Sequence, residues 1–410
     1  MENFLKKYLK GNATIWIVFI LLCMVSILEM YSASSTLAFK SSNTAMPILR
    51  HAGFLFFGVI LASFVHLIPY KYIRLLAYLG LFLSFILLIL VYYKGQSAND
   101  ATRWYEIGGF QFQPSELAKL SVIIVVADFI SRIKNEAEDE KKYFRYIIIV
   151  LAAICPLILF ENFSTAMLLF GVVFIMMFIG GISIKKLGLL LLAISLFVVG
   201  GYAMIKTIPE ESMPKIFDRA YTWSARIDRY TEEKKQEENK YVITDENRQV
   251  QHGRIAIARG GMLGVMPGNS VERDYLPQAY SDFIYAIIVE EMGLVGGIII
   301  ILFYLVLLYR AGRIAVKSQT VFPALLVIGL SLMIVMQAFV SMAVATSLGP
   351  VTGQPLPLIS RGGTSIIITC IYFGIILGVT RQLKGEQQFD EEKPEGQEQN
   401  FPVVDLNELS

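Results

Sequence analysis

The chain has 410 residues, of which 55% are hydrophobic and only 17% are charged, and its formal net charge is +2. This composition excludes an ordinary soluble domain and is typical of a protein that crosses a membrane several times. A net charge so close to zero gives no reason to expect nucleic-acid binding. The three cysteines lie inside apolar runs, where they indicate neither a disulfide framework nor a metal site.

Ten apolar runs are long enough to cross a bilayer. In chain order they are Ile15–Tyr31, Phe54–Ile68, Leu75–Tyr92, Leu117–Ile130, Tyr146–Phe160, Thr165–Gly181, Leu187–Ile205, Gly293–Tyr309, Val321–Leu348 and Ser365–Thr380. The first run follows three lysines but lacks a cleavage site of small residues, so we read it as a retained helix. The fifth is short and contains Pro156. We predict an all-α, polytopic membrane protein with about ten transmembrane helices.

Basic residues are concentrated before the first run and after the second, fourth, sixth, eighth and tenth runs. Because short cytoplasmic loops carry an excess of Lys and Arg, we predict that both termini face the cytoplasm. The alternate connections then face outward, and they include a large loop at about 207–281, between the seventh and eighth helices. We assign residues 1–384 to the membrane domain and expect 385–410, which is rich in Glu, Gln and Pro, to be a disordered cytoplasmic tail.

Asp282 lies where this polar loop ends and a very apolar segment begins. An ionisable residue at a membrane edge is costly unless it faces water or a cavity, which makes Asp282 a candidate for a functional site. The alternative is that Asp282 only caps a helix that begins at Phe283. Glu290 and Glu291 lie deeper in the segment. They either face the interior of the bundle or belong to a short helix that precedes the true span.

The other unusual polar residues also fall in or beside outward connections. Arg103 and Trp104 place a guanidinium next to an indole, although Trp104 could equally belong to an aromatic belt at the membrane interface. A helix is expected to start at Pro114, and on it Glu116 and Lys119 share a face and can form a pair. Such a pair either offsets its own burial cost or lines a polar cavity.

Three further outward connections have unusual sequences. Residues 161–165 form a tight turn in which Ser164 or Thr165 is a candidate helix cap. Residues 260–270 form a glycine-rich loop, which we expect to be flexible and which lacks the spacing of a nucleotide-binding loop. Residues 349–365 contain three prolines and four glycines near membrane depth. This composition indicates a re-entrant stretch, which is tolerated only where it lines a cavity or packs against protein.

These features together indicate a polar cavity that opens outward from a helical bundle. The cavity would contain one strong candidate for an acidic functional residue, Asp282, and three cations, Arg103, Lys119 and Arg361. Cations suit a ligand that carries phosphate, and a membrane setting suits a lipid-linked ligand. A carboxylate suits either a general base or a metal ligand.

Several motifs, in the right order, resemble the SEDS family (shape, elongation, division and sporulation), which includes FtsW and RodA. The resemblance extends from about Ile15 to Arg381. The matching pieces are Thr102-Arg103-Trp104 with Phe112-Gln-Pro-Ser-Glu-Leu-Ala-Lys119, Gly260-Gly261 with Gly268-Asn269-Ser270, Leu276-Pro277 with Ser281-Asp282-Phe283, Glu290-Glu291-Met-Gly293, and Pro350-Val-Thr-Gly-Gln-Pro-Leu-Pro357 with Ser360 and Gly362-Gly363. The sequence Gly268-Asn-Ser-Val followed by Tyr-Leu-Pro is closer to the FtsW branch than to the RodA branch.

The resemblance implies a peptidoglycan glycosyltransferase that polymerises lipid II on the outer face of the cytoplasmic membrane, at the septum if it belongs to the FtsW branch. The donor would be a glycan on undecaprenyl pyrophosphate. The implied protein partners are a class B penicillin-binding transpeptidase and other division proteins. The alternatives are a RodA-like elongation polymerase, and a flippase of lipid II or a scaffold of the division machinery.

The resemblance also implies that Asp282 is the catalytic residue. Arg103, Trp104, Glu116 and Lys119 are implied as functionally sensitive. The remaining candidates for substrate binding are Thr165, Asn269, Ser270, Pro277, Thr352, Ser360 and Arg361. No cofactor is certain, but a divalent cation, Mg²⁺ or Mn²⁺, held by Asp282 is the alternative to a general base.

The chain departs from the family pattern at several positions. Where the family has Pro-Asp-Leu/Phe-Gly-Thr, this chain has Glu161-Asn162-Phe-Ser-Thr, so a carboxylate is lost or shifted. The common Ser-Tyr-Gly-Gly is replaced by a sequence with Arg361 in second place, which adds a cation near the cavity. Ser341 replaces a usual Asn and Pro267 replaces a usual Gly. These departures leave Asp282 in place.

Overall fold

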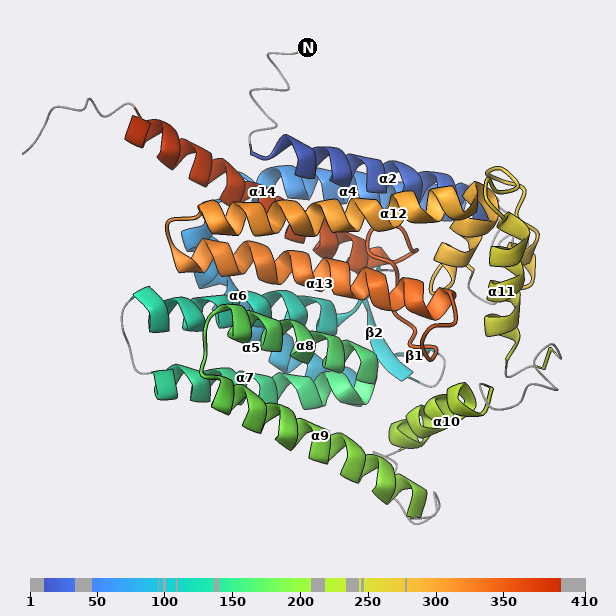
Figure 1. The fold of residues 1–410 in the computed structure, drawn as a ribbon, viewed down its shortest axis with the longest axis horizontal. Coiled ribbons are helices and arrows are strands. Elements are labelled where there is room, and N and C mark those ends of the chain that lie inside the picture. The colour runs from blue at the N-terminus through green and yellow to red at the C-terminus, as the bar shows by residue number, and fades with distance from the viewer. Residues whose placement is uncertain are drawn as a thin grey trace, which may run out of the picture.

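The computed structural model describes residues 11–33, 46–94, 96–98, 101–107, 110–135, 140–207, 218–233, 243–244, 247–276 and 279–391. Long helices run side by side and form a bundle (Figure 1). Ten helices coincide with the predicted spans: α2 (Ala13–Ala33), α4 (Met46–Val65), α5 (Tyr70–Lys94), α6 (Pro114–Asn135), α7 (Glu140–Glu161), α8 (Phe163–Ile179), α9 (Ile184–Thr207), α12 (Ile284–Lys317), α13 (Val321–Ala345) and α14 (Gly363–Glu391). The predicted polytopic helical fold is confirmed.

Eight of these helices are long and apolar enough to cross a membrane, judged on length and composition within the described chain. The other two are α6 and α8. α8 has only 17 residues, and α6 carries several charged side chains that are buried and paired inside the bundle. Such pairing is what makes charged residues tolerable at membrane depth. α7 continues without a break through Pro156, the proline that interrupts the fifth predicted span.

The centre of the bundle is formed by α6, α13 and α14. In α13 and α14, 78% of the most apolar 18-residue window is buried inside the protein, whereas in α9 the share is 0%. α6 packs between α5 and α13. α9 lies along the outside of the bundle (Figure 1). Its exposed leucine and phenylalanine side chains suit contact with lipid.

Both described ends of the chain lie at one end of the bundle (Figure 1). Asn12 N donates to Thr380 Oγ1 (3.0 Å), and Arg381 Nη2 donates to Leu67 O (2.8 Å). α14 continues as a helix past the predicted boundary at 384 and ends at Glu391. The residues of this extension are mostly Glu and Gln, which are good helix formers. The rest of the predicted tail, 392–410, lies outside the described residues.

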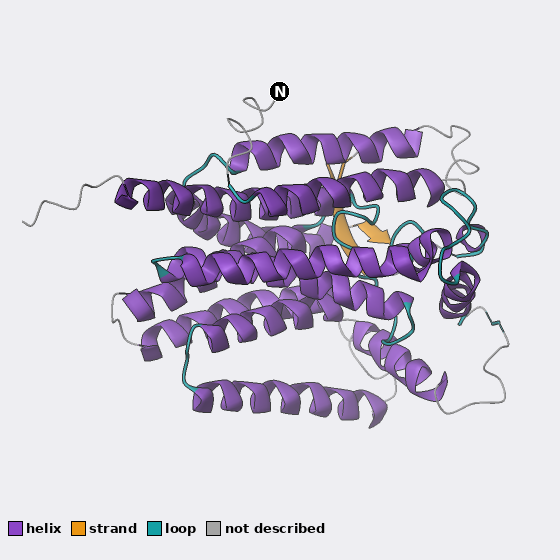
Figure 2. Ribbon diagram, turned by 45° about the horizontal axis from the view of Figure 1, so that its top comes forward, coloured by secondary structure: helices purple, strands orange, loops and turns teal. Residues whose placement is uncertain are grey.

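The opposite end carries a small sheet that the sequence analysis had treated as part of a connection. β1 (Gln96–Ala98), β2 (Ala101–Ile107) and β3 (Phe110–Phe112) pair antiparallel in the order β1-β2-β3. Figure 2 shows the strands among the helices, toward the end that carries the large loop. This loop contains α10 (Asp218–Glu233), α11 (Arg248–Gly260) and the short 3₁₀ helix η3 (Glu272–Asp274).

α10 is attached to the end of α9. The Tyr202 hydroxyl donates to Asp228 Oδ1 (2.7 Å), and Lys206 Nζ lies 3.1 Å from the same oxygen. These two contacts stabilise the ionised carboxylate, so they lower the pKa of Asp228 below its usual value. The Trp223 ring of α10 also packs on the Phe163 ring, with 4.0 Å between centroids. α10 is therefore held against both α8 and α9.

α12 is bent at Gly293, where φ is 69° and ψ is −175°. A straight helix would join the amides of residues 294 and 295 to the carbonyls of residues 290 and 291. Four hydrogen bonds to the glycine-rich loop replace those two. They run from Val265 N to Glu290 O (3.0 Å), from Met266 N to Glu291 O (2.9 Å), from Leu294 N to Gly261 O (2.9 Å) and from Val295 N to Met262 O (3.3 Å). The loop that we expected to be flexible is inserted into the bend.

The bend separates a short first part of α12, residues 284–292, from the long span that follows. Glu290 and Glu291 lie on the short part, and both are 0% exposed. Both alternatives for this acidic pair therefore hold at once. The pair belongs to a helix that precedes the span, and it also faces the interior of the protein.

We expect Gly293→Ala to destabilise the protein by about 1–3 kcal/mol, the cost of a strained backbone conformation. A Cβ at this position would lie 2.2 Å from Met262 O, and a backbone atom cannot move away cheaply. The measurement is the thermal unfolding midpoint of the purified protein in detergent. Gly312→Ala in the same helix is the matched control, since a Cβ there would meet nothing within 4 Å. Equal midpoints for the two variants would show that the loop does not lock the bend.

Candidate functional site

Asp282 lies in the turn between η3 and α12 and is half-buried. The hydroxyl of Ser281 donates to Asp282 Oδ1 (2.9 Å). α12 begins at Ile284, its N-cap residue is Phe283, and no side chain caps that position. Asp282 therefore precedes the cap position. A catalytic role for Asp282 stays a prediction.

The proline- and glycine-rich stretch between α13 and α14 packs against this turn. Ser360 Oγ donates to Ser281 O (2.6 Å), and Arg361 N donates to Tyr280 O (2.8 Å). The guanidinium carbon of Arg361 lies 5.1 Å from the centroid of the Tyr280 ring. The structure therefore places two of the predicted site residues, Ser360 and Arg361, directly beside the Asp282 turn.

The same stretch is tied to four helices through its backbone and side chains. Ser26 Oγ donates to Leu358 O (2.6 Å), Tyr304 OH to Pro357 O (2.6 Å), Gln337 Nε2 to Pro355 O (3.1 Å), and Gln354 Nε2 to Thr165 Oγ1 (2.6 Å). Side chains of α2, α12 and α13 thus donate to carbonyls of the stretch, and the stretch itself donates to α8 through Gln354. Irregular backbone at membrane depth must be satisfied within the protein, and the predicted re-entrant stretch meets that requirement.

The predicted pair between Glu116 and Lys119 is present. Lys119 Nζ lies 2.7 Å from Glu116 Oε1 and also donates to Gln337 Oε1 (3.0 Å). The Lys119 and Glu116 side chains are only 1% and 8% exposed. Because Gln337 also binds Pro355 O, the pair is connected to the stretch between α13 and α14. The charge of Lys119 is thus neutralised inside the bundle.

The small sheet also reaches this region. Thr364, at the start of α14, accepts from Gln113 N (3.3 Å) and donates to Gln111 O (3.2 Å). β2 carries Arg103 and Trp104. Trp104 is half-buried, while the side chain of Arg103 lies outside the described part of the chain. The sheet therefore places Arg103 and Trp104 at the end of the bundle that carries Asp282. Substrate binding by these two residues stays a prediction.

Three more residues that were predicted to bind substrate lie in different parts of the chain. Thr165 is buried on α8, where it is the acceptor of the bond from Gln354. Thr352 is half-buried in the stretch between α13 and α14. Pro277 lies outside the described residues. Substrate binding by these three stays a prediction.

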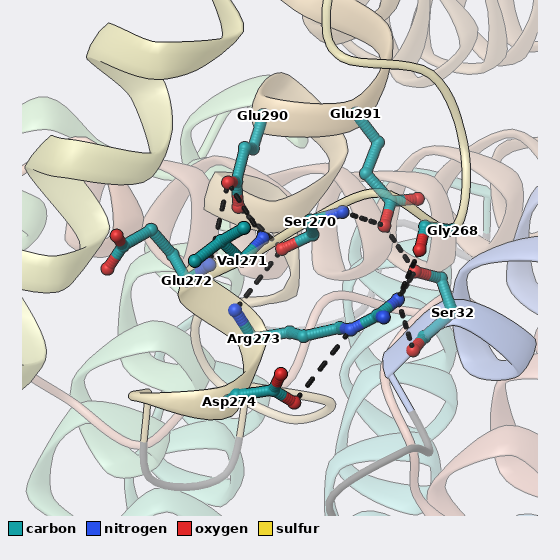
Figure 3. Close-up of polar contacts among 9 residues, drawn as sticks. All are labelled: Ser32, Gly268, Ser270, Val271, Glu272, Arg273, Asp274, Glu290 and Glu291. Atoms are coloured by element: carbon teal, nitrogen blue, oxygen red, sulfur yellow. Dashed lines mark hydrogen bonds and ion pairs between the residues drawn. The ribbon is translucent and has the colours of Figure 1, made fainter.

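Ser270 lies in a second polar cluster, around Glu290 and Glu291 (Figure 3), and Asn269 precedes it in the chain. Ser270 Oγ donates to Glu290 Oε2 (2.5 Å), and Ser270 N donates to Glu291 Oε1 (3.4 Å). Ser270 is 2% exposed, whereas Asn269 is exposed and donates to Val265 O (3.0 Å). The structure uses Ser270 to hold the loop to the short part of α12. Substrate binding by either residue stays a prediction.

Arg273 connects this second cluster to the end of α2 (Figure 3). Its Nη1 donates to Gly268 O (2.8 Å), to Ser32 Oγ (3.0 Å) and to Ser32 O (3.2 Å). The Ser32 hydroxyl in turn donates to Glu291. Sequence reasoning missed Ser32 and Arg273, which lie 241 positions apart. The loop before Asp282 is therefore fixed at both α2 and α12.

At the other end of the bundle, sequence reasoning also missed Asp128. This carboxylate is fully buried on α6, with Arg74 Nε 2.5 Å from Oδ1 and Arg132 Nε 3.1 Å from Oδ2. The Tyr78 hydroxyl donates to the same group. Both arginines belong to the basic residues that follow the second and fourth apolar runs, and their positions in the sequence predict only cytoplasmic connections. The spacing of four between Asp128 and Arg132 was the available signal.

Glu29 is a third missed residue. It lies on α2, is 0% exposed, and neither carboxylate oxygen has a hydrogen-bond partner among the described residues. It is close enough to Glu291 for the two carboxylates to interact electrostatically. An acidic residue inside the first apolar run was the sequence signal, since such residues mark functional or costly positions.

We expect Glu29→Met to raise the stability of the protein by about 1–3 kcal/mol, because it removes a buried polar group that lacks a partner. The measurement is a rise in the thermal unfolding midpoint in detergent. Glu290→Met is the contrasting variant. It removes the acceptor for Ser270 Oγ and Val271 N, so its midpoint should fall. A fall for Glu29→Met as well would show that its carboxyl group stabilises the fold.

The cap at the turn between α7 and α8 is Asn162, and the predicted caps Ser164 and Thr165 are wrong. The Asn162 side-chain oxygen accepts from Ser164 N (3.0 Å). Asn is among the best N-cap residues because its short side chain reaches the free amides of the first helical turn. Although this chain lacks the family's carboxylate at 162, it keeps an acceptor there.

No three His, Cys, Asp or Glu side chains of the described chain are grouped so that they could hold a metal ion. Asp282 therefore offers a single carboxylate. Mg²⁺ often binds proteins through one or two carboxylates and takes its other ligands from substrate phosphates and water. A cation at Asp282 would need such ligands from a bound substrate.

The helical bundle, with its charged residues buried and paired and its half-exposed acid at one end, defines an integral membrane protein with a polar site at the membrane edge. The chain belongs to the FtsW/RodA/SpoVE family, described as "Cell cycle protein", whose model matches residues 12–385. This confirms the family that the motifs resemble.

Curated relatives cover nearly all of the chain. A probable peptidoglycan glycosyltransferase FtsW of Taylorella equigenitalis is 34% identical over 337 residues, which are 80% of this chain and 86% of the relative. The corresponding protein of Hahella chejuensis is 29% identical over 381 residues, or 91% of each chain.

Solved structures share the fold. A chain from a peptidoglycan synthase complex matches with a TM-score of 0.71 and 21% identity, covering 91% of this chain and 98% of that one. RodA of Thermus thermophilus matches with a TM-score of 0.63 and 22% identity, covering 91% and 97%. At these identities the likeness establishes the architecture, and the chemistry must be argued from the residues of this chain.

Proposed function

We propose that the protein is a peptidoglycan glycosyltransferase that polymerises lipid II into glycan strands. The observation that carries this proposal is the half-exposed carboxylate of Asp282, held in a turn that Ser360 and Arg361 bind at one end of the bundle. The names of the relatives support the same reaction class. A lipid-linked substrate suits a site at the edge of a membrane helix.

In the proposed reaction, two lipid-linked sugars meet at Asp282. The donor is a glycan on undecaprenyl pyrophosphate, and the acceptor is lipid II. The 4-hydroxyl oxygen of the acceptor GlcNAc bonds to the anomeric carbon of the donor MurNAc, and Asp282 takes the hydroxyl proton. The bond from that carbon to the pyrophosphate oxygen breaks, and undecaprenyl pyrophosphate leaves with the electron pair. A positioned base of this kind typically contributes about 100- to 10,000-fold.

Among the candidate cations, Arg361 suits the leaving group best. Lys119 is 1% exposed and bound to Glu116, so its charge is already neutralised. Arg361 is half-exposed, and its backbone binds Tyr280 in the Asp282 turn. A guanidinium can also form two parallel hydrogen bonds to a phosphate. In this proposal, the Glu116–Lys119 pair supports the walls of the site.

The proposed orientation places the Asp282 end outside the cytoplasmic membrane and both termini in the cytoplasm. The supporting observation is that the lysine- and arginine-rich connections lie at the end of the bundle where the described chain begins and ends (Figure 1). A class B penicillin-binding transpeptidase and other division proteins are the proposed partners. The FtsW names of the relatives favour work at the division septum over RodA-like elongation.

The test is polymerisation of labelled lipid II by the purified full-length protein in nanodiscs. The cognate transpeptidase is present and its crosslinking is blocked with a β-lactam, so that strands are resolved by length on a gel. Long glycan strands are expected. Their absence with the partner confirmed bound would overturn the glycosyltransferase proposal. Localisation of a fluorescent fusion to the septum or the lateral wall decides between division and elongation.

A further inference from the structure

Arg361 and Tyr280 form a pair through both their backbones and their side chains. The amide of Arg361 donates to the carbonyl of Tyr280 (2.8 Å), and the guanidinium carbon lies 5.1 Å from the ring centroid. A cation within about 6 Å of an aromatic centroid is attracted by the negative face of the ring. The ring therefore restricts where the long Arg361 side chain can place its charge.

This pair lies next to the reacting carboxylate. Ser281 joins Tyr280 to Asp282, and its hydroxyl donates to Asp282 Oδ1 (2.9 Å). The carbonyl of Ser281 accepts from Ser360 Oγ (2.6 Å). Two consecutive residues of one segment, 280 and 281, thus accept hydrogen bonds from two consecutive residues of the other, 361 and 360. Arg361 is therefore held next to the turn that carries the Asp282 carboxylate.

The backbone that carries Arg361 is itself firmly held. Ser360 N donates to Leu356 O (2.9 Å), and Leu356 N donates to Ser360 Oγ (2.7 Å), which closes a tight turn. Leu358 within this turn has a φ of 67°, and its carbonyl accepts from Ser26 (2.6 Å). Since this turn is anchored, the remaining freedom of Arg361 lies in its side chain, and the Tyr280 ring limits that freedom.

Among the described residues, no salt bridge joins Arg361 to a carboxylate, whereas Lys119 is paired with Glu116 (2.7 Å). A half-exposed guanidinium, with several N–H donors in a planar fork, suits an anion with several oxygens, such as a diphosphate.

We infer that Tyr280 is a positioning residue that holds Arg361 against the diphosphate of the lipid-linked donor. The inference rests on the proposed glycosyltransferase function. When the bond between the anomeric carbon and the diphosphate oxygen breaks, the electron pair stays on that oxygen. Arg361, placed over the Tyr280 ring, stabilises this charge through hydrogen bonds that are already oriented. Tyr280 acts through Arg361 and does not touch the reacting atoms.

The test measures binding of undecaprenyl pyrophosphate separately from turnover. The full-length protein in nanodiscs is titrated with undecaprenyl pyrophosphate, with undecaprenyl monophosphate as the second probe. We expect Arg361→Met to weaken binding of the diphosphate by about 10- to 100-fold, the range for hydrogen bonds to a charged group. We expect Tyr280→Leu to weaken it by about 2- to 5-fold, and Tyr280→Phe, which keeps the ring, to retain it.

A double variant isolates the positioning role. In the Arg361→Met background, Tyr280→Leu is expected to cause no further loss, because the ring acts through the guanidinium. Tyr309→Leu is the matched control, since it removes another arginine–tyrosine pair (Arg313 to Tyr309, 6.0 Å) from the opposite end of the bundle. Arg361→Lys, which keeps the charge but loses the planar fork, serves if Arg361→Met fails to fold, and an intermediate loss is expected.

Two outcomes separate the inference from the proposed function. If the wild type forms no strands, the glycosyltransferase proposal fails whatever the binding data show. If it forms strands but Arg361→Met binds the diphosphate as tightly as the wild type, the inference is overturned. Equal losses for Tyr280→Phe and Tyr280→Leu, or additive losses in the double variant, would also overturn the role of the ring.

Discussion

Asp282→Asn is expected to abolish the formation of long glycan strands, with a fall in initial rate of about 100- to 10,000-fold. Asn has the same size as Asp, and its side-chain oxygen can still accept the bond that Ser281 Oγ donates (2.9 Å). What the variant loses is the group that takes the proton from the acceptor hydroxyl. The measurement is the initial rate of lipid II polymerisation with the transpeptidase present and blocked.

Asp274→Asn is the matched control for this experiment. Asp274 is an acid of the same outer loop with a side chain that is 55% exposed, and its contact to Arg273 is long (3.9 Å). We expect its rate to equal that of the wild type. A wild-type rate for Asp282→Asn would show that Asp282 is not catalytic.

Metal removal separates a base from a metal ligand at Asp282. If Asp282 acts as a base without a cation, treatment with a chelator leaves the wild-type rate unchanged. If a cation is required, the rate falls and returns when Mg²⁺ or Mn²⁺ is added. An unchanged rate would identify Asp282 as a base, and loss and recovery of the rate would identify it as a metal ligand.

Glu116→Gln is expected to destabilise the protein by about 3–5 kcal/mol, the usual cost of breaking a buried ion pair. The variant leaves the positive charge of Lys119 at 1% exposure without its counter-ion 2.7 Å away. The thermal unfolding midpoint in detergent measures this loss. The double variant Glu116→Gln with Lys119→Met contains no buried charge at this place, so it should recover most of the stability.

A surface pair provides the control for this effect. Glu140→Gln breaks a pair with Lys186 (3.1 Å) whose side chains are 37% and 28% exposed. Because water and salt screen such a pair, we expect a loss below about 1 kcal/mol. Similar losses at the buried and the exposed pair would refute the importance of burial at Glu116 and Lys119.

The exchanged pair, Glu116→Lys with Lys119→Glu, separates support from chemistry. If the pair only supports the site, the exchange should restore both stability and strand formation. Restored stability without strand formation would show that one of the two side chains contacts the substrate directly.

Sequence alone was sufficient for the features that depend on local order. Apolar runs predict the helices because a span must bury its backbone and present about twenty apolar residues to lipid. The Glu116–Lys119 pair follows from helical spacing. Asp282 stands out because it lies where polarity changes abruptly. These predictions need only neighbouring residues, and the structure confirms the helices and the pair.

Tertiary structure decided which polar side chains can contact a substrate and which are bound to partners inside the protein. Lys119 and Arg361 are both candidate cations for the site in the sequence, yet one is buried against Glu116 and the other lies half-exposed beside Tyr280. Ser270 belongs to the same motif as Asn269, yet it is buried against Glu290. Availability depends on partners that the fold supplies, and these partners do not follow from residue type.

The bend of α12 and the buried acids show the physical reason. Gly293 is one glycine among 31 in the sequence, and its role appears only when residues 261–266 insert into the bend. Asp128 neutralises Arg74 from another helix, and Glu291 binds Ser32 from a position 259 residues away. Hydropathy and helical spacing describe contacts within one helix or one loop. Contacts between distant segments form only when the helices pack, so the tertiary structure alone determined them.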